Sequence, residues 1–207
     1  MENTVFTIGH STHPQERFIE LLRQHEITAV CDVRSKPYSR MNPQFNRENL
    51  SKVLASHGIE YRFLGRELGA RSEDPSCYEG DKVRYAKLAG TQLFRNGLKR
   101  VQRGLKDGFQ IALMCAEKEP LECHRTILVA PRLTALGIAV QHIHADGHLE
   151  THDAASLRLA RLLNMPENHM FSSQAELIAD AYYRQEERIA YDKSGDADAM
   201  AVRDGAA

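Results

Sequence analysis

Two cysteines, a histidine and an arginine lie close together in the segment CAEKEPLECHRT, residues 115 to 126. Cys115 and Cys123 are separated by seven residues, and His124 and Arg125 follow directly. These residue types suit a thiol nucleophile, a metal site or a disulfide. A packed turn that contains sulfur would have the same sequence, since buried, unreactive cysteine is common.

The cysteine content favours free thiols over a disulfide. The chain has 4 cysteines in 207 residues, which is unlike the disulfide framework of a small secreted protein. Its first residues, MENTVFTIGH, lack the basic start and apolar run of a signal peptide. No uninterrupted apolar stretch has the length needed to span a bilayer. We therefore expect a cytoplasmic protein with reduced thiols and no membrane partner.

A metal site and a thiol nucleophile remain as alternatives for Cys115 and Cys123. Their spacing lacks the short Cys-x2-Cys of structural zinc, and a closed site would need a further ligand such as His10 or His144. We therefore predict no metal and no cofactor, and keep a metal-dependent enzyme as the alternative. Either cysteine is a candidate nucleophile. His124 and Arg125 would lower the thiol pKa of Cys123, and Cys115 lies at the end of the central strand, where the sheet meets its ligand.

Short apolar runs alternate with amphipathic segments over the first 150 residues. We expect strands at Val5–Ile8, Ile27–Val33, Ile59–Phe63, Gln110–Met114 and Ile138–Ile143. Helices are expected at Pro14–Gln24, at Arg47–His57, at Asp81–Lys106 with breaks near Gly90 and Gly97, and at Thr126–Leu136. This alternation predicts an α/β core domain over residues 1–150, with an open, mostly parallel sheet of about five strands and helices on both faces.

The remaining residues have a different pattern. Helical spacing over Asp153–Leu163 and Ser173–Tyr191 predicts a C-terminal helical extension, residues 151–193, and Ser173 with Glu176 forms a capping-box pattern. Small and acidic residues from 194 to 207 predict a disordered tail.

Polar and ionisable residues follow every predicted strand. In open α/β sheets, ligands bind beyond the carboxyl ends of the strands, so we expect one pocket lined by His10, Asp32, Arg34, Glu117 and His124. Asp32 or Glu117 would act as acid or base. The predicted catalytic residues are Asp32, Cys115, Glu117, Cys123 and His124.

The loop after the second predicted strand indicates an anionic ligand. Its cations and hydroxyls suit a phosphate, and a tyrosine ring suits a base. Residues 34–71 contain eight Arg or Lys against three Glu, although the net charge of the chain is -1, so the basic region is local. Structural salt bridges and a tight turn are the alternative explanations. The predicted substrate-binding residues are His10, Ser11, Arg34, Ser35, Lys36, Tyr38, Arg66 and Arg125.

Four motifs carry a resemblance to a known family. TIGHS, DVRSKPYS, LGRELGAR and CAEKEPLECHR, in this order over residues 4 to 145, resemble the bacterial family catalogued as domain of unknown function 488. The third motif of that family usually has a second glycine where this chain has Ala70. The resemblance implies an α/β fold and a shared site but no particular reaction. Members have been discussed near nucleic acid modification and repair, which favours a nucleotide or nucleic acid as the substrate.

These observations together predict an enzyme, a hydrolase or transferase, that binds an anionic nucleotide or nucleic acid at the C-terminal edge of the sheet. A non-catalytic nucleic-acid-binding module, a metal-dependent enzyme and a ligand sensor remain as alternatives. The near-zero net charge argues against general attraction to nucleic acid or membranes.

Overall fold

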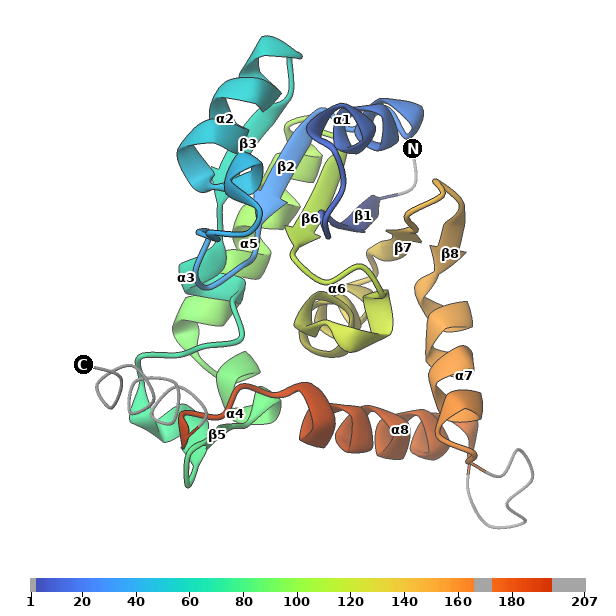
Figure 1. The fold of residues 1–207 in the computed structure, drawn as a ribbon. Helices are drawn as coiled ribbons and strands as arrows, with labels where there is room; N and C mark the ends of the chain where they lie inside the picture. Colours follow the sequence, from blue (N-terminus) through green and yellow to red (C-terminus); the bar gives the residue numbers. More distant parts are fainter. Residues whose placement is uncertain (1–2, 166–172, 195–207) are drawn as a thin grey trace.

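A computed structural model of the chain describes residues 3–165 and 173–194, and its centre is a six-stranded sheet (Figure 1). The strand order is β3-β2-β6-β1-β7-β8. The first five of these, β1 (Thr4–Gly9), β2 (Ala29–Asp32), β3 (Glu60–Phe63), β6 (Ile111–Cys115) and β7 (Ala139–Ile143), are parallel. The edge strand β8 (Leu149–Thr151) is antiparallel to β7. The predicted α/β class and mostly parallel sheet are confirmed, and β8 is a strand that the sequence did not predict.

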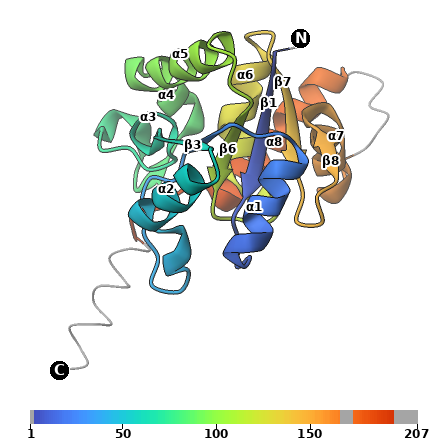
Figure 2. The same ribbon diagram turned by 90° about the horizontal axis from the view of Figure 1, so that it is seen from above.

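Helices cover both faces of the sheet (Figure 2). Helices α1 (Gln15–Gln24) and α2 (Arg47–Ser56) pack on one face, while α5 (Gln92–Lys106), α6 (Ala130–Thr134) and α7 (His152–Leu162) pack on the other. Successive residues of a strand point to opposite faces. Met114 of β6 accordingly packs on the α1 side, whereas Cys115 packs on the α6 side.

The predicted helix over residues 81–106 is two helices preceded by a hairpin. The hairpin pairs β4 (Tyr78–Glu79) with β5 (Lys82–Val83), and α4 (Tyr85–Ala89) ends at Gly90 before α5 begins. The predicted break near Gly97 is wrong. A Cβ atom at Gly97 would lie 2.7 Å from Glu67 Cβ, so this glycine allows α5 to approach α3 (Gly65–Leu68) closely.

The segment after Cys115 is less regular than predicted. It runs through a short 3-10 helix, η3 (Pro120–Glu122), and then through a π-helical turn, η4 (Arg125–Val129), which continues into α6. Two further 3-10 helices are η1 (Pro43–Phe45) and η2 (Pro75–Cys77). Single π-helical turns are often found at functional sites, and this one follows His124 directly.

The C-terminal helices lie where they were predicted, and the last one crosses the carboxyl edge of the sheet (Figure 1). Helix α8 (Gln174–Ile189) begins with the predicted capping box at Ser173, and the Gln185 side chain donates a hydrogen bond to the Leu121 carbonyl at 2.8 Å. The chain then returns beside β5, where Val83 N–H donates to the Tyr191 carbonyl at 2.9 Å. This places the end of the described chain over the edge where the site residues gather.

Two further predictions concern the C-terminal tail and the absence of a membrane-spanning segment. The predicted tail lies outside the described residues except for Ser194. Among the helices that the structure describes, none has both the length and the apolar character needed to cross a membrane.

Candidate functional site

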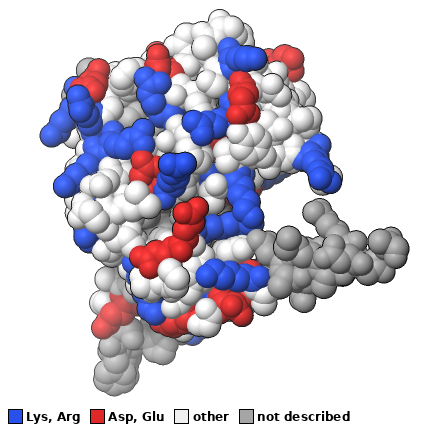
Figure 3. Space-filling view, turned by 90° about the vertical axis from the view of Figure 1, so that its left-hand side faces the viewer, with Lys and Arg blue, Asp and Glu red and all other residues white. Residues whose placement is uncertain are grey.

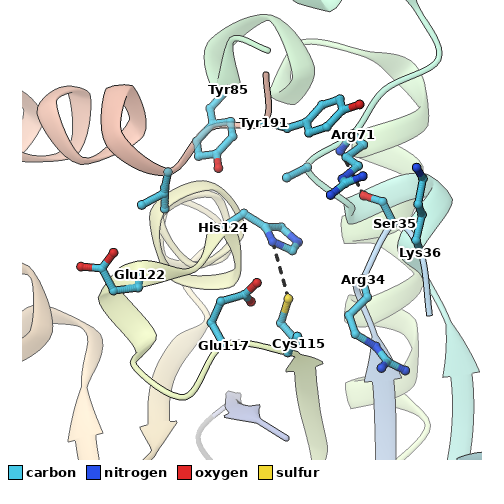
Figure 4. Close-up of a pocket in the computed structure, with 13 residues that line it drawn as sticks. Arg34, Ser35, Lys36, Arg71, Tyr85, Cys115, Glu117, Glu122, His124 and Tyr191 are labelled. Carbon is cyan, nitrogen blue, oxygen red and sulfur yellow. Dashed lines mark hydrogen bonds between the residues drawn. The ribbon is translucent and has the colours of Figure 1, made fainter. Parts of the chain in front are cut away.

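A cavity of about 360 Å³ opens at the carboxyl edge of the sheet, beyond the ends of β2 and β6 (Figure 4). Six predicted site residues line it: Arg34, Ser35, Lys36, Cys115, Glu117 and His124. The other lining residues were not predicted as site residues: Ala70, Arg71, Tyr85, Ala116, Glu122, Ile189 and Tyr191.

One wall of the cavity carries Cys115, His124 and Glu117, and the buried Cys123 contacts the last two. His124 Nδ1 lies 3.7 Å from Cys115 Sγ and 3.8 Å from Cys123 Sγ. Cys123 Sγ and Glu117 Oε2 are 2.9 Å apart, a hydrogen bond that holds one proton between thiol and carboxyl. Both cysteines and His124 are buried, so these groups interact with little competition from water.

The pKa values of the groups on this wall are shifted in different directions. Burial opposes a charge on Cys123, but the hydrogen bond from Cys115 and the charges of Arg125 and His124 outweigh it and lower the Cys123 pKa. Burial and the neighbouring Cys123 raise the pKa of Cys115 and also that of Glu117. Burial acts to lower the His124 pKa, but the Cys123 charge prevails and raises it. These opposite shifts make Cys123 the more acidic of the two thiols.

The loop that carries Glu117 is fixed from two sides. Arg125, which is fully buried, donates hydrogen bonds to the backbone carbonyls of Glu117 at 2.8 Å and Lys118 at 3.3 Å. Gly9 lies against the same loop, and a Cβ atom there would be 1.9 Å from the Glu117 carbonyl oxygen. The predicted substrate-binding residue Arg125 therefore contacts the protein backbone, and its guanidinium shapes the turn.

Asp32, Arg34 and His10 form a separate network on the other face of the sheet. The Arg34 guanidinium makes two hydrogen bonds to the Asp32 carboxylate, at 2.9 and 2.6 Å, and a third to His10 Nε2 at 3.0 Å. Tyr61 O–H donates to Asp32 at 2.7 Å, and His10 stacks on Phe45. Burial and Arg34 lower the His10 pKa to about 4, so His10 is a neutral acceptor.

This separation has a simple cause in the strands. Asp32 follows Cys31 and precedes Val33, both of which pack on the α6 side, so its side chain points to the α1 side. Figure 4 accordingly shows the Arg34 guanidinium directed away from His124 and Cys115. The single pocket predicted for five residues is therefore wrong in part, because Asp32 and His10 do not line it.

The wall opposite the thiols is formed by two loops that pack together. Arg71 N–H donates to Ser35 Oγ at 3.0 Å. Gly69 has no room for a Cβ, which would lie 2.4 Å from Ser35 Oγ. The Arg71 guanidinium lies 4.3 Å from the centre of the Tyr191 ring, and Lys36 completes this wall. The cavity thus brings two cations and an aromatic ring opposite Glu117 and the thiols.

The remaining predicted residues lie elsewhere. Ser11 contributes its backbone N–H to the Ala116 carbonyl at 2.9 Å, and Tyr38 is exposed and donates to Glu48 at 2.7 Å. Arg66 lines a second cavity, of about 800 Å³, between α2, β3, α3 and α5. Figure 3 shows Lys and Arg side chains spread over the upper part of this side of the molecule, with acidic side chains among them.

The fold and this cavity define an α/β protein with thiol, imidazole and carboxyl groups at the carboxyl edge of a parallel sheet. The chain belongs to the family described as domain of unknown function DUF488, whose model matches residues 14–130. No curated protein and no solved structure matched the chain.

The residues that were missed come from parts of the chain that approach the sheet only through tertiary structure. Tyr85 begins α4, and Ile189 and Tyr191 lie at the end of α8 and beyond it. No motif or spacing relates them to the strand ends. The motif LGRELGAR contains both Arg66, which was predicted as a site residue, and Arg71, which lines the cavity instead. Which of the two arginines reaches the cavity depends on the packing of α3 and could not be predicted from the motif.

Proposed function

We propose that the protein is an enzyme that binds an anionic nucleotide or nucleic acid in the cavity at the carboxyl edge of the sheet and carries out hydrolytic or group-transfer chemistry. The observation that supports this most is the pairing of walls: Glu117, Cys115 and His124 face a wall that contains Lys36 and Arg71 (Figure 4). Cations hold an anionic substrate, and the opposite wall offers acid, base and nucleophile.

Each wall has a defined part in the proposal. Lys36, Arg71 and Ser35 would bind a phosphate group, and the Tyr191 and Tyr85 rings would contact a base. Glu117 would transfer a proton to or from the reacting group, since it lines the cavity and its backbone is held by Arg125. A cytoplasmic location belongs to the same proposal, because the chemistry requires reduced thiols.

The test combines binding and turnover. Nucleoside mono-, di- and triphosphates and short single-stranded DNA and RNA would be titrated into the protein by calorimetry, and products followed by chromatography with mass detection. We expect Lys36→Ala and Arg71→Ala each to weaken binding about 10-fold, which is about 1.4 kcal/mol. Lys99→Ala, an exposed cation that lines neither cavity described above, is the matched control.

Glu117→Gln separates an enzyme from a binding module. The enzyme proposal expects this variant to bind the substrate with unchanged affinity and to lose at least 100-fold in kcat. Binding that neither Lys36→Ala nor Arg71→Ala weakens would overturn the assignment of the cavity. Tight binding with no product, in the parent protein as well, would identify the non-catalytic nucleic-acid-binding module instead.

A further inference from the structure

Cys115, Cys123 and His124 bring three metal-binding atoms to one point. Their donor atoms all lie within 4.8 Å of one another, and all three residues are buried. Cys115 comes from the end of β6, while Cys123 and His124 come from the segment between η3 and η4. Within residues 3–165 and 173–194, this is the one group of three or more such side chains that converges in this way.

The two separations between sulfur and nitrogen match a tetrahedral zinc centre. Zinc–sulfur bonds of about 2.3 Å and a zinc–nitrogen bond of about 2.05 Å, at the tetrahedral angle, separate sulfur from nitrogen by about 3.6 Å. The two observed separations are 3.7 Å from Cys115 Sγ to His124 Nδ1 and 3.8 Å from Cys123 Sγ to the same atom. An ion could therefore enter with shifts of about 0.2 Å or less in these separations.

The orientation of His124 provides a second, independent observation. Its Nε2 lies 3.1 Å from the Val33 carbonyl oxygen. A carbonyl oxygen can only accept, so Nε2 carries the hydrogen and Nδ1 is the ring atom left to face the two sulfurs. Metal-binding histidines commonly have this arrangement, in which one ring nitrogen donates to a backbone carbonyl and the other binds the ion.

We propose that Cys115, Cys123 and His124 bind one Zn²⁺ ion, whose fourth coordination position opens to the cavity and holds a water molecule. Three protein ligands and one open position are typical of catalytic zinc, whereas structural zinc has four protein ligands. Two thiolates and an imidazole favour zinc over hard cations such as Mg²⁺. This inference deepens the proposed function, since the ion would supply the water for hydrolysis.

Glu117 completes the proposed centre as its acid and base. Its Oε2 atom lies 2.9 Å from Cys123 Sγ, and the residue lines the cavity beside Cys115. In the reaction, the Glu117 carboxylate takes a proton from the zinc-bound water, and the resulting hydroxide forms a bond to the electrophilic atom of the substrate. The bond to the leaving group then breaks, and Glu117 returns the proton to that group, so one water molecule is consumed and no oxidant is needed.

A closed zinc site would need a fourth protein ligand, and neither His10 nor His144 provides it. His10 receives a hydrogen bond from Arg34 on the opposite face of the sheet, and His144 pairs with Glu150 at 2.9 Å. The sequence-based prediction of no metal counted ligands for a closed site. With an open position, the three residues of the motif itself are sufficient.

The first test measures metal directly in the whole protein. The untagged chain would be purified without chelator, and its metal content determined by mass spectrometry. We expect one zinc per chain. X-ray absorption at the zinc edge should show two sulfur neighbours at about 2.3 Å and two nitrogen or oxygen neighbours at about 2.0 Å. Absence of zinc together with failure of added Zn²⁺ to bind would overturn the proposal, and so would a zinc shell without sulfur.

The second test uses Co²⁺ in place of Zn²⁺, because cobalt reports its ligands by absorption. The parent protein, stripped of metal, should develop a sulfur-to-cobalt band in the near ultraviolet and the visible bands of tetrahedral cobalt. Cys115→Ser and Cys123→Ser should each lower the near-ultraviolet band by about half or abolish it, and His124→Ala should weaken binding at least 10-fold. Cys31→Ser, a buried free thiol on β2, is the matched control. An unchanged spectrum in Cys123→Ser would contradict the assignment.

The two proposals fail separately. If zinc is absent but Lys36→Ala and Arg71→Ala weaken nucleotide binding, the metal inference is wrong and the cavity assignment stands. If zinc is bound through both thiols but no nucleotide or nucleic acid binds, the metal inference stands and the proposed substrate class is wrong. Because X-ray absorption uses the unaltered chain, variants that fail to fold do not affect this outcome.

Discussion

Asp32 and Arg34 show how a pair of residues suited to catalysis can serve the fold instead. Both side chains are buried, and their charges are matched by two hydrogen bonds between them and by further bonds from Tyr61 and to Phe45. A buried charge that loses its partner costs far more than an exposed one. The geometry therefore makes this pair a support for the turn that leads to Ser35 and Lys36.

Asp32→Asn should therefore destabilise the protein strongly. Removal of the negative charge leaves the buried Arg34 without its counterion, and we expect a loss of about 3 kcal/mol in the free energy of unfolding. Urea denaturation followed by circular dichroism would measure it. Glu60→Gln is the control, because its ion pair with Arg62 is about half exposed on both sides and should contribute at most about 0.5 kcal/mol. Equal losses in the two variants would contradict this account.

The residues of the site were predictable from the sequence to the extent that they follow strands. Cys115, Glu117 and His124 were found because the CAEKEPLECHR motif follows the most apolar strand, and they do line one cavity. His10 and Asp32 were assigned to the same cavity because both also follow strands. The sequence could not distinguish the two faces, since a shift of one residue along a strand reverses the direction of its side chain.

At the level of elements, five strands and most helices were predicted, and the misses share a cause. Apolar periodicity identified the central strands of the sheet, β1, β2 and β6, because these are buried on both faces. The helix break predicted at Gly97 was wrong, because this glycine lies inside α5 and permits close packing with α3. Periodicity also failed for β8 and for the β4–β5 hairpin, whose two or three residues are too few to show a period.

Gly9 tests whether the contact between the first turn and the Glu117 loop positions the site. In Gly9→Ala the new Cβ would lie 1.9 Å from the Glu117 carbonyl oxygen, so the loop must move. We expect a loss of about 1–3 kcal/mol in unfolding free energy and, in addition, a fall of at least 10-fold in nucleotide turnover. Urea denaturation and the turnover assay described above would measure the two effects.

Gly58→Ala is the matched control for that prediction. Gly58 has a positive φ of 73° and nothing within 4 Å of an added Cβ, so alanine there strains the backbone without touching the site. It should cost about 1 kcal/mol in stability and leave turnover unchanged. If the two variants lost turnover in proportion to their stability alone, the positioning role of Gly9 would be refuted.

At the scale of the whole molecule, a buried chain of polar groups connects the sheet to the C-terminal helices. Thr7 of β1 and His142 of β7 are 2.8 Å apart, His142 and His152 of α7 are 3.1 Å apart, and Tyr182 of α8 lies 3.1 Å from His152. Burial lowers the His152 pKa to about 4, and burial together with His152 lowers that of His142. Both rings are therefore neutral in the folded protein near pH 7.

These buried histidines should make the protein lose stability in acid. Between pH 6.5, where an unfolded histidine takes up a proton, and pH 4, where folded His152 does so, the unfolded state binds more protons. The free energy of unfolding therefore falls as the pH is lowered, by about 3 kcal/mol from His152 alone over this range. His10, whose pKa is lowered to about 4 by burial and by Arg34, acts in the same direction.

Urea denaturation at steps from pH 7.5 to 4.5 would measure how the free energy of unfolding changes with pH. His152→Gln should reduce this slope even if the variant is less stable at neutral pH. The exposed His57→Gln should keep the parent slope, and a parent protein with constant stability from pH 7 to 5 would show that these histidines are not held neutral by the fold.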